Sequence, residues 1–250
     1  MKRITFILAS CFLFLVSNAQ IKHKVMVIPF EPKLYMSEID HKINAETKLS
    51  QKEIKEAFRK SINAELTRAF KQKYEVLDLL KDTVKYKKDI LNIYKNITFN
   101  YEKVPDQSNY KAPEEEKGKK GSTIKNGQIL LETNSDARFM NTKVTNPALI
   151  PGLFAKYKTD LFLFVNQMDV FSGQVATNDI GTLAERIITL HYTVFTVDAK
   201  EINSGVCSIK FPADVNTPAK ITSGYVSKIA IEITRRIAIA LRKIEATPKK

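Results

Sequence analysis

The sequence predicts an α/β protein of the mixed (α+β) type, in which long amphipathic helices pack on a mixed central sheet. Three observations indicate this fold. Residues 25–28 and 161–165 are apolar without alternation, as expected of strands covered on both faces. Two long segments repeat apolar residues at spacings of three and four, which is typical of helices with one buried face. Residues 186–197 and 205–211 alternate apolar and polar side chains, as half-buried strands do.

The first nineteen residues have the pattern of a signal peptide and are not expected to belong to the fold. The positive Met1–Arg3 precedes an uncharged apolar run that ends at Val16. Ser17 and Ala19 then place small residues where a signal peptidase cleaves. The run is too short to cross a bilayer, which needs about 20 apolar residues. We therefore expect cleavage before Gln20 and a location in the periplasm of a Gram-negative cell.

A different processing of the leader would produce a lipoprotein. Leu8-Ala9-Ser10-Cys11 resembles a lipobox, in which the cysteine is lipidated and becomes the new amino terminus. However, the apolar segment continues from Phe12 to Val16, beyond that cysteine. Simple secretion is thus the main expectation, and a lipoprotein anchored through Cys11 is the alternative.

The mature chain would be basic and would hold one cysteine. Cleavage leaves 231 of the 250 residues, and the loss of Lys2 and Arg3 lowers the formal charge from +13 to +11. Such a charge can attract anionic lipid, glycan or nucleic acid, and export makes nucleic acid the least expected partner. The lysines are spread singly, which is typical of a solvated surface. Cys207 alone cannot form an intramolecular disulfide, so packing must stabilise the fold.

The expected domain organisation is one α/β domain with an insertion. Residues 20–101 and 127–250 form the two parts of the domain. Residues 102–126 form a flexible charged insertion, because eleven of these twenty-five residues are charged and few are apolar. At its end, Asn126-Gly127 lies between "STIK" and "QILL" and predicts a hairpin with a type I′ turn.

The elements follow from local signals along the chain. Ser50 and Glu53 form a capping box, which predicts the start of a long helix. The expected order is a strand at 23–30, a helix at 50–73, a strand at 74–80, a helix through Ile90, Tyr94 and Ile97, the insertion, a short helix within 146–160, a strand at 161–165, a hairpin from 186–197 and 205–211, and a helix at 222–246.

Five segments occur in an order that resembles the superfamily of the TolB amino-terminal domain and the CsgG-like curli secretion proteins. They are "KVMVIPF", "EIKEAFRKSINAELTRAF", "KTDLFLFVNQMDV", "YTVFTVDAKEINSGVCSI" and "YVSKIAIEITRRIAIAL". The turn from Asp198 to Gly205 is longer than in that family, and neither the propeller of TolB nor the membrane hairpins of the curli channel is evident. The resemblance implies a non-catalytic module of cell-envelope assemblies and transfers no functional residues.

Signals for catalysis, cofactors or metals are weak, so we expect a protein that is not an enzyme and that has no cofactor. His23, His41 and His191 lack metal-ligand spacing. A thiol–imidazole pair of His191 and Cys207 is conceivable on neighbouring strands, but the alternation around Cys207 places this residue in the core. "GKKGST" from Gly118 lacks the order and the context of a phosphate loop.

The loop at 31–49 is the candidate partner-contact site. It follows a buried strand, where ligands gather in open α/β sheets, and it precedes a helix whose amino end would favour an anion. Glu38, Asp40 and Glu46 could also form a weak Ca²⁺ site, although their spacing matches no known calcium-binding loop. The alternative is a structural role, in which apolar side chains such as Ile39 cover the sheet edge. We expect the structural role first and partner contact second, through Tyr35, Met36, Glu38 and Asp40.

These observations predict an exported, non-catalytic protein that binds other components of a cell-envelope assembly. The expected contact surfaces are the 31–49 loop and the 102–126 insertion. The expected partners are envelope proteins, with peripheral contact to anionic lipid or glycan as a further possibility and no nucleic acid. The alternatives are a soluble carrier of a small anionic ligand or glycan and, third, a hydrolytic enzyme without a recognisable motif.

Overall fold

The computed structural model describes residues 23–105, 123–125, 128–130, 138–172 and 185–246. The predicted signal peptide, Cys11, Asn126-Gly127 and most of the predicted insertion lie outside these ranges. Within the described ranges, no helix combines the length and the apolar character that a membrane crossing requires.

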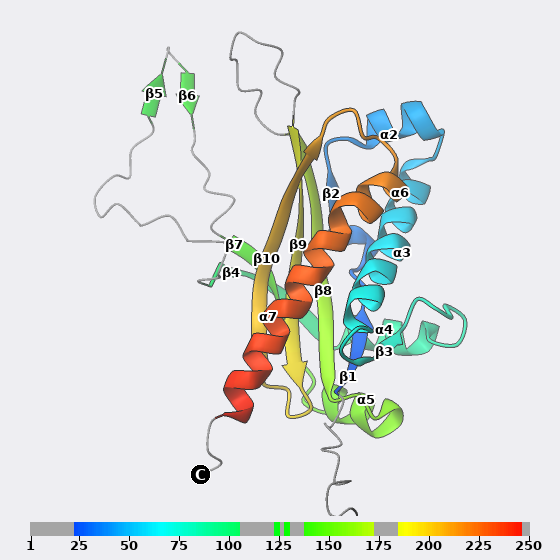
Figure 1. Ribbon diagram of the computed structural model, residues 1–250, viewed down its shortest axis with the longest axis vertical. Coiled ribbons are helices and arrows are strands. Elements are labelled where there is room, and N and C mark those ends of the chain that lie inside the picture. Colours follow the sequence, from blue (N-terminus) through cyan, green and yellow to red (C-terminus); the bar gives the residue numbers. More distant parts are fainter. Residues whose placement is uncertain (1–22, 106–122, 126–127, 131–137, 173–184, 247–250) are drawn as a thin grey trace, which may run out of the picture.

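The fold class predicted from the sequence is confirmed, because helices pack on a mixed central sheet (Figure 1). The main strands lie in the order β10-β9-β8-β1-β3. β1 pairs in parallel with both β3 and β8, whereas β9 pairs in antiparallel fashion with both β8 and β10. The bounds are Lys24–Ile28 for β1, Glu75–Asp78 for β3, Leu161–Ser172 for β8, Glu185–Thr196 for β9 and Glu201–Pro212 for β10.

β8 is much longer than the five-residue strand predicted at this place. β1 pairs with its first part, from Leu161 to Phe164, and β2 (Tyr35–Ser37) pairs in parallel with its later part, from Met168 to Val170. A 3₁₀ turn at Pro32–Leu34 connects the two short strands. Asn166 lies at an irregularity in the pairing of β8 with β9. One edge of β8 therefore carries two short strands, one beyond the other.

Both faces of the sheet are covered, which explains the uninterrupted apolar runs. Val25 and Val27 face a core shared with α3 (Gln51–Phe70) and α7 (Ser227–Glu245), whereas Met26 and Ile28 face a second core shared with α4 (Lys87–Lys95) and α5 (Leu149–Tyr157). Figure 1 shows α3 and α7 together over the same side of the sheet. The short helices α2 (Asp40–Thr47) and α6 (Pro218–Ile221) lie at one end of this layer.

The predicted helix ends are partly confirmed. The capping box of α3 forms, since the Ser50 N–H donates to Glu53 Oε2 at 2.8 Å and the Glu53 N–H donates to Ser50 Oγ at 3.4 Å. The expected extension of the next helix to Ile97 is wrong, because α4 ends at Lys95 and Ile97 begins a strand. The first turn of the predicted final helix, Thr222–Val226, has π-helical geometry.

A two-stranded ribbon was not predicted from the sequence. β4 (Ile97–Lys103) and β7 (Arg138–Val144) pair in antiparallel fashion and lie across the face of β8, β9 and β10 opposite to α7. Glu102 and Lys103, which were assigned to the insertion, therefore belong to β4. The predicted hairpin around residues 126–127 is confirmed by the antiparallel pairing of β5 (Thr123–Lys125) and β6 (Gln128–Leu130).

His23 connects the amino end of β1 to β8 and α7. Its Nδ1 hydrogen-bonds to Asp160, just before β8, and its Nε2 lies 3.4 Å from Glu245 Oε1 at the end of α7. Burial alone would lower the pKa of His23, but the hydrogen bonds and the charges of the two carboxylates raise it above its ordinary value. The first and the last described elements are thus joined at one end of the molecule.

The raised pKa of His23 predicts a pH-dependent contribution to stability. The folded state binds the proton more tightly than the unfolded chain, so the contribution is complete below the unfolded pKa, about 6.5, and is lost as pH rises through the folded pKa. We expect His23→Gln to lower the free energy of unfolding more at pH 5.5 than at pH 8.5 (about one unit below and two units above that value), measured by urea denaturation. His41→Gln, at an exposed position on α2, is the control. An equal loss for His23→Gln at both pH values would contradict the assignment.

Candidate functional site

The predicted loop at 31–49 is a structured segment made of the 3₁₀ turn, β2 and α2. Tyr35 is buried, and its hydroxyl donates a 2.6 Å hydrogen bond to Asp40 Oδ1. Burial, together with this hydrogen bond, raises the pKa of Tyr35 well above its ordinary value. Ile39 is buried as well, as expected of a residue that covers the core. Tyr35 and Asp40 therefore have structural contacts within the segment.

Glu38 fastens the same segment to the carboxyl end of β8. Its N–H donates to the Val170 carbonyl at 3.0 Å, and its Oε2 accepts a 2.9 Å hydrogen bond from the Ser172 N–H. The described residues contain no group of three His, Cys, Asp or Glu side chains that could hold a metal ion, so the Ca²⁺ alternative gains no support from Glu38, Asp40 and Glu46. At the amino end of α3, the Glu53 carboxylate lies within the first turn and disfavours a bound anion.

Met36 differs from the other three candidate residues because its side chain is half exposed. It pairs with Asp169 of β8, and Phe171 lies two residues further along β8, opposite Ile187 of β9. Paired residues, and residues two apart in a strand, point to the same face of a sheet. Met36, Phe171 and Ile187 therefore share one face, and we call them the apolar strip. Met36 is 51% exposed and Phe171 is 41% exposed.

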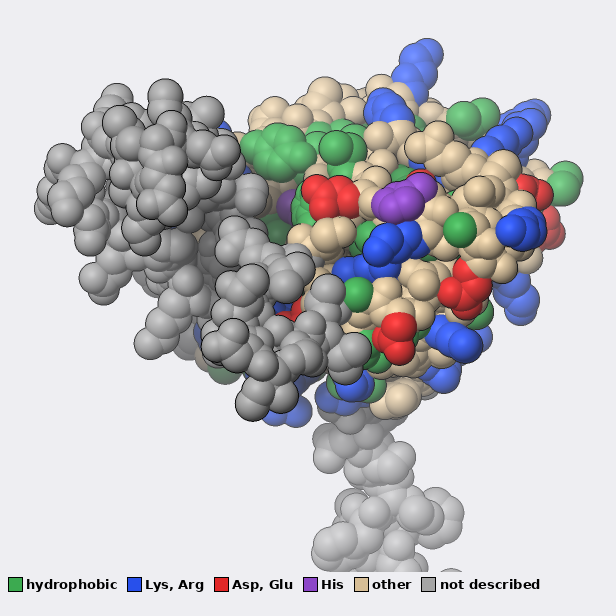
Figure 2. All heavy atoms as spheres, turned by 90° about the horizontal axis from the view of Figure 1, so that it is seen from above, with side chains coloured by type: hydrophobic (Ala, Val, Ile, Leu, Met, Phe, Trp, Pro, Cys, Tyr) green, Lys and Arg blue, Asp and Glu red, His purple; other side chains and the backbone are tan. Residues whose placement is uncertain are grey.

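Seen from the end where β2 and α2 lie, the surface shows hydrophobic side chains grouped beside acidic ones (Figure 2). Apolar side chains that adjoin on a surface mark contact sites more often than isolated ones do. The structure thus brings one of the four predicted contact residues, Met36, into an exposed apolar group. It places Tyr35, Glu38 and Asp40 in the framework beneath.

A buried polar layer fills the space between the sheet and the β4–β7 ribbon. In its first part, His191 Nε2 lies 3.0 Å from Asp169 Oδ2, and the Met140 N–H donates to His191 Nδ1 at 2.9 Å. Gln167 Nε2 donates to Asp169 Oδ1 at 2.6 Å, and the Tyr101 hydroxyl donates to Gln167 Oε1 at 2.7 Å. These bonds connect β4, β7, β8 and β9 in one network.

The second part of the polar layer surrounds Asn166. Its side-chain amide donates to the Met140 carbonyl and to Thr193 Oγ1, both at 2.7 Å. Its Oδ1 accepts from Thr142 Oγ1 at 2.6 Å, and the Thr193 hydroxyl donates to Asn141 Oδ1 at 2.5 Å. The irregular pairing at Asn166 thus turns an amide, which can donate and accept at once, toward the ribbon.

The His191–Asp169 pair resembles a catalytic dyad in composition, but its bonds assign it to the framework. Because the Met140 N–H donates to Nδ1, the ring proton lies on Nε2 and is donated to Asp169. Both ring nitrogens and both carboxylate oxygens are therefore used within the fold. A general base needs a lone pair directed at a substrate, and His191 directs neither nitrogen outward.

Cys207 does not pair with His191. The strands place Leu190 opposite Cys207 and Val206 opposite His191, so the thiol and the imidazole lie on opposite faces of the sheet. Cys207 belongs to the core beneath α7, where burial raises the pKa of its thiol to about 11. The sequence prediction of a packed thiol agrees with this environment, because a buried thiol of raised pKa is a poor nucleophile.

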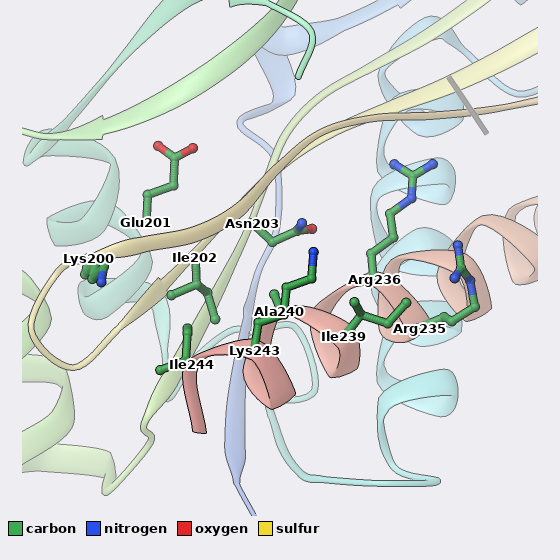
Figure 3. Close-up of a pocket in the computed structure, with 10 residues that line it drawn as sticks. All are labelled: Lys200, Glu201, Ile202, Asn203, Arg235, Arg236, Ile239, Ala240, Lys243 and Ile244. Atoms are coloured by element: carbon green, nitrogen blue, oxygen red, sulfur yellow. The ribbon is translucent and has the colours of Figure 1, made fainter. Parts of the chain in front are cut away.

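A groove of about 430 Å³ lies between the start of β10 and the last turns of α7 (Figure 3). Its apolar walls are Ile202 from β10 and Ile239 and Ile244 from α7. Lys200, from the turn before β10, and Lys243, from α7, contribute positive charge from opposite walls. We call this site the β10–α7 groove.

The one carboxylate among the groove residues is turned away from it. Figure 3 shows the Glu201 side chain on the other side of β10 from α7. There it accepts hydrogen bonds from Asn141 Nδ2 at 3.1 Å and Ser204 Oγ at 2.5 Å, and it lies 3.6 Å from Lys143 Nζ. The Glu201 carboxylate therefore belongs to the contacts of the ribbon side and not to the groove.

Arg236 also lines the groove and is largely buried. Its Nε donates to Glu232 Oε1 at 2.8 Å, and its Nη1 donates to the Val206 carbonyl at 2.7 Å. Hydrogen bonds from Arg235 and Arg236 lower the pKa of Glu232, although partial burial opposes them. Arg236 thus bonds to the backbone of the edge strand β10.

The sequence of α7 contains a signal for this groove. Ile231, Arg235, Ile239 and Lys243 follow one another at spacings of four, which places them in one row on a helix. This row lies outside the buried row of α7, and Ile231 and Ile239 are exposed. Isoleucines on the solvent-exposed face of a helix indicate a surface that contacts another molecule.

Comparisons with known proteins do not assign a family. No family model matches the chain, and no curated protein is detectably similar in sequence. Among solved structures, the chain is similar to lipoprotein GNA1162 from Neisseria meningitidis, with 10% identity, a TM-score of 0.35, and coverage of 86% of this chain and 98% of that one. It is also similar to the hypothetical protein CT253 from Chlamydia trachomatis, with 9% identity, a TM-score of 0.32, and coverage of 90% and 96%.

TM-scores this low support no statement about function. The resemblance to the TolB amino-terminal domain and to the CsgG-like proteins therefore stays a prediction from the sequence.

The buried polar layer predicts a large stability loss when its histidine is replaced. His191→Leu would leave the Met140 N–H and the Asp169 carboxylate without their buried partner. We expect the free energy of unfolding to fall by at least about 2 kcal/mol, because each buried polar group left unpaired costs about 1–3 kcal/mol. Thr189→Val, two residues away on the same strand, removes one exposed hydrogen bond to Ser208 and leaves no buried group unpaired, so it should change this free energy by less than about 1 kcal/mol. Equal denaturant midpoints for the two variants would refute a structural role for His191.

Proposed function

We propose that the chain is an exported, non-catalytic protein of the bacterial cell envelope that binds other envelope proteins. The leader pattern at residues 1–19 supports export. The sequence offered His191 and Cys207 as candidate reactive groups, and the use of both within the framework supports binding over catalysis.

The observation that carries the proposal is the exposure of the apolar strip. Met36 and Phe171 are diagonal neighbours on adjacent strands, and both are exposed although the strands that hold them are well ordered by pairing. Methionine has a flexible, polarizable side chain that adapts to the shape of a partner. The backbone beneath is fixed by Glu38 and Tyr35. A rigid frame with adaptable apolar side chains is a suitable contact surface for a protein.

A second candidate function is a soluble carrier of a small anionic ligand or glycan. The volume of the β10–α7 groove, about 430 Å³, lies within the range of small-molecule sites, and its walls combine isoleucines with lysines. A carrier would be stabilised by its ligand without any partner protein, by about 2.7 kcal/mol at a hundredfold excess over Kd. Thermal shifts in the presence of soluble anions separate the two functions.

The apolar strip can be tested by partner capture. We expect the double variant Met36→Asp and Phe171→Asp to lose at least about tenfold in capture of the envelope proteins that cross-link to the wild type. Burying one such side chain contributes about 1.5–3 kcal/mol, and about 1.4 kcal/mol corresponds to tenfold in affinity. The measurement is quantitative mass spectrometry after cross-linking in cells, with secretion into the periplasm checked by fractionation.

The matched control for this experiment is Val84→Asp combined with Leu91→Asp. Val84 is 87% exposed in the turn between β3 and α4, and Leu91 is 58% exposed on α4, so this variant introduces the same two charges at exposed apolar positions away from the apolar strip. Capture should stay at the wild-type level. If the variant Met36→Asp with Phe171→Asp is folded, as judged by circular dichroism, and captures as much as the wild type, the proposed contact surface is overturned. A chain retained in the cytoplasm would overturn the proposed function as a whole.

A further inference from the structure

Arg186 brings a positive charge to the border of the apolar core. It is the second residue of β9, lies opposite Phe211 of β10 and is only 2% exposed. Paired residues point to the same face of a sheet, and Phe211 belongs to the core beneath α7. An arginine is almost never fully buried without a partner of opposite charge. The position of Arg186 therefore calls for an anion.

The hydrogen bonds of Arg186 within the fold leave one edge of its guanidinium unused. Its Nη1 donates to the Val215 carbonyl at 3.3 Å and to Asn216 Oδ1 at 2.8 Å, and both acceptors are neutral. Its Nη2 is buried and has no hydrogen-bond partner in the part of the chain that the structure describes. Within the same part of the chain, Nη1 makes all the hydrogen bonds of this side chain. The edge formed by Nε and Nη2 is therefore free.

The charge of Arg186 also lacks an ion pair with any acid of the described residues. Asp214, in the turn that holds Val215 and Asn216, acts on the guanidinium through its charge alone. Burial lowers the pKa of Arg186, and the attraction of Asp214 opposes this effect. A buried charge without a partner is strongly destabilising. An anion bound at the free edge would remove that penalty.

The free edge has the geometry of a carboxylate site. The N–H groups of Nε and Nη2 are parallel and lie in one plane, so they match the two oxygens of a carboxylate. A dianion such as phosphate fits less well, because the negative charge of Asp214 lies nearby and repels it more strongly. The bonds from Nη1 to Val215 and Asn216 fix the orientation of the guanidinium in advance.

We infer that Arg186 binds a carboxylate, which accepts hydrogen bonds from Nε and Nη2. The carboxylate belongs either to a small free acid or to an acidic side chain of a protein partner, since both present the same group. Asp214 is exposed and Asn216 is half exposed, so the site is reached through the turn that carries them. The inference goes beyond the proposed function, because it uses neither the apolar strip nor the β10–α7 groove.

The test measures acetate binding by the purified chain from Gln20 to Lys250, by isothermal titration calorimetry at constant ionic strength. We expect Arg186→Lys to bind acetate at least about tenfold more weakly, because lysine keeps the charge but loses one of two charge-assisted hydrogen bonds. Arg68→Lys makes the same exchange at an exposed arginine of α3 and should bind like the wild type. Circular dichroism checks that each variant is folded.

A second variant keeps the test decisive if Arg186→Lys does not fold. Asp214→Asn removes an exposed negative charge near Arg186 and should bind acetate more tightly than the wild type. A purely structural role of Arg186 predicts no such gain. Binding by Asp214→Asn with none by the wild type would make Asp214 itself the partner of Arg186 and would overturn the inference.

The source of the carboxylate follows from a comparison of two probes. Tighter binding of acetate than of the peptide acetyl-Gly-Glu-Gly-amide indicates a small free acid, and the reverse order indicates a protein side chain. Either order supports the inference if Arg186→Lys weakens the binding. Equal binding by the wild type and Arg186→Lys, no binding of either probe, or tighter binding of inorganic phosphate than of acetate would refute it. Because purified chain and small probes are the only components, these outcomes do not depend on the envelope partners of the proposed function.

Discussion

The structure depends on β8, a strand of twelve residues that is buried from Leu161 to Val170. Its first residues pair with β1, its later residues pair with β2, and its other edge pairs with β9 along most of its length. Each neighbour is placed in register by the backbone hydrogen bonds of this one strand. The two ends of β8 consequently set the positions of both surfaces considered above, since the groove lies near its start and the apolar strip near its end.

The two faces of the sheet meet different requirements. The face beneath α3 and α7 is closed mainly by aliphatic and aromatic side chains, which are held by close packing. The face beneath the β4–β7 ribbon is closed in part by His191, Asn166 and Thr193, each of which needs partners in fixed directions. A network in which every member is paired specifies one arrangement of the ribbon on the sheet, because a shifted register would leave several buried groups unpaired.

Local signals predicted most helices and strands, and non-local contacts explain what was missed. The apolar runs of β1 and β8, the capping box of Ser50 and the alternation in β9 and β10 depend only on neighbours in sequence. The ribbon could not be found in this way, since β4 and β7 are short, polar and separated by more than thirty residues. His191 and Thr193 alternate with apolar residues and so resembled a solvated face, although the ribbon buries them.

The segment at 31–49 shows the same limit of prediction from local sequence. Proline and mixed composition at 31–49 indicated a loop, whereas pairing with β8 makes part of it a strand. The sequence could not separate Met36 from Tyr35, because the side of the sheet on which each lies depends on that pairing. The groove was missed for a different reason, as its walls come from β10 and α7, and only the isoleucines on the wet face of α7 indicated it.

The bond between Arg236 and the Val206 carbonyl has a consequence for the behaviour of the protein at high concentration. An exposed edge strand is a template on which identical chains can stack through their backbones. A guanidinium held by Glu232 against that edge blocks the template at its middle with a positive charge that a second copy would also carry. Backbone pairing of a second copy along the middle of β10 is therefore disfavoured.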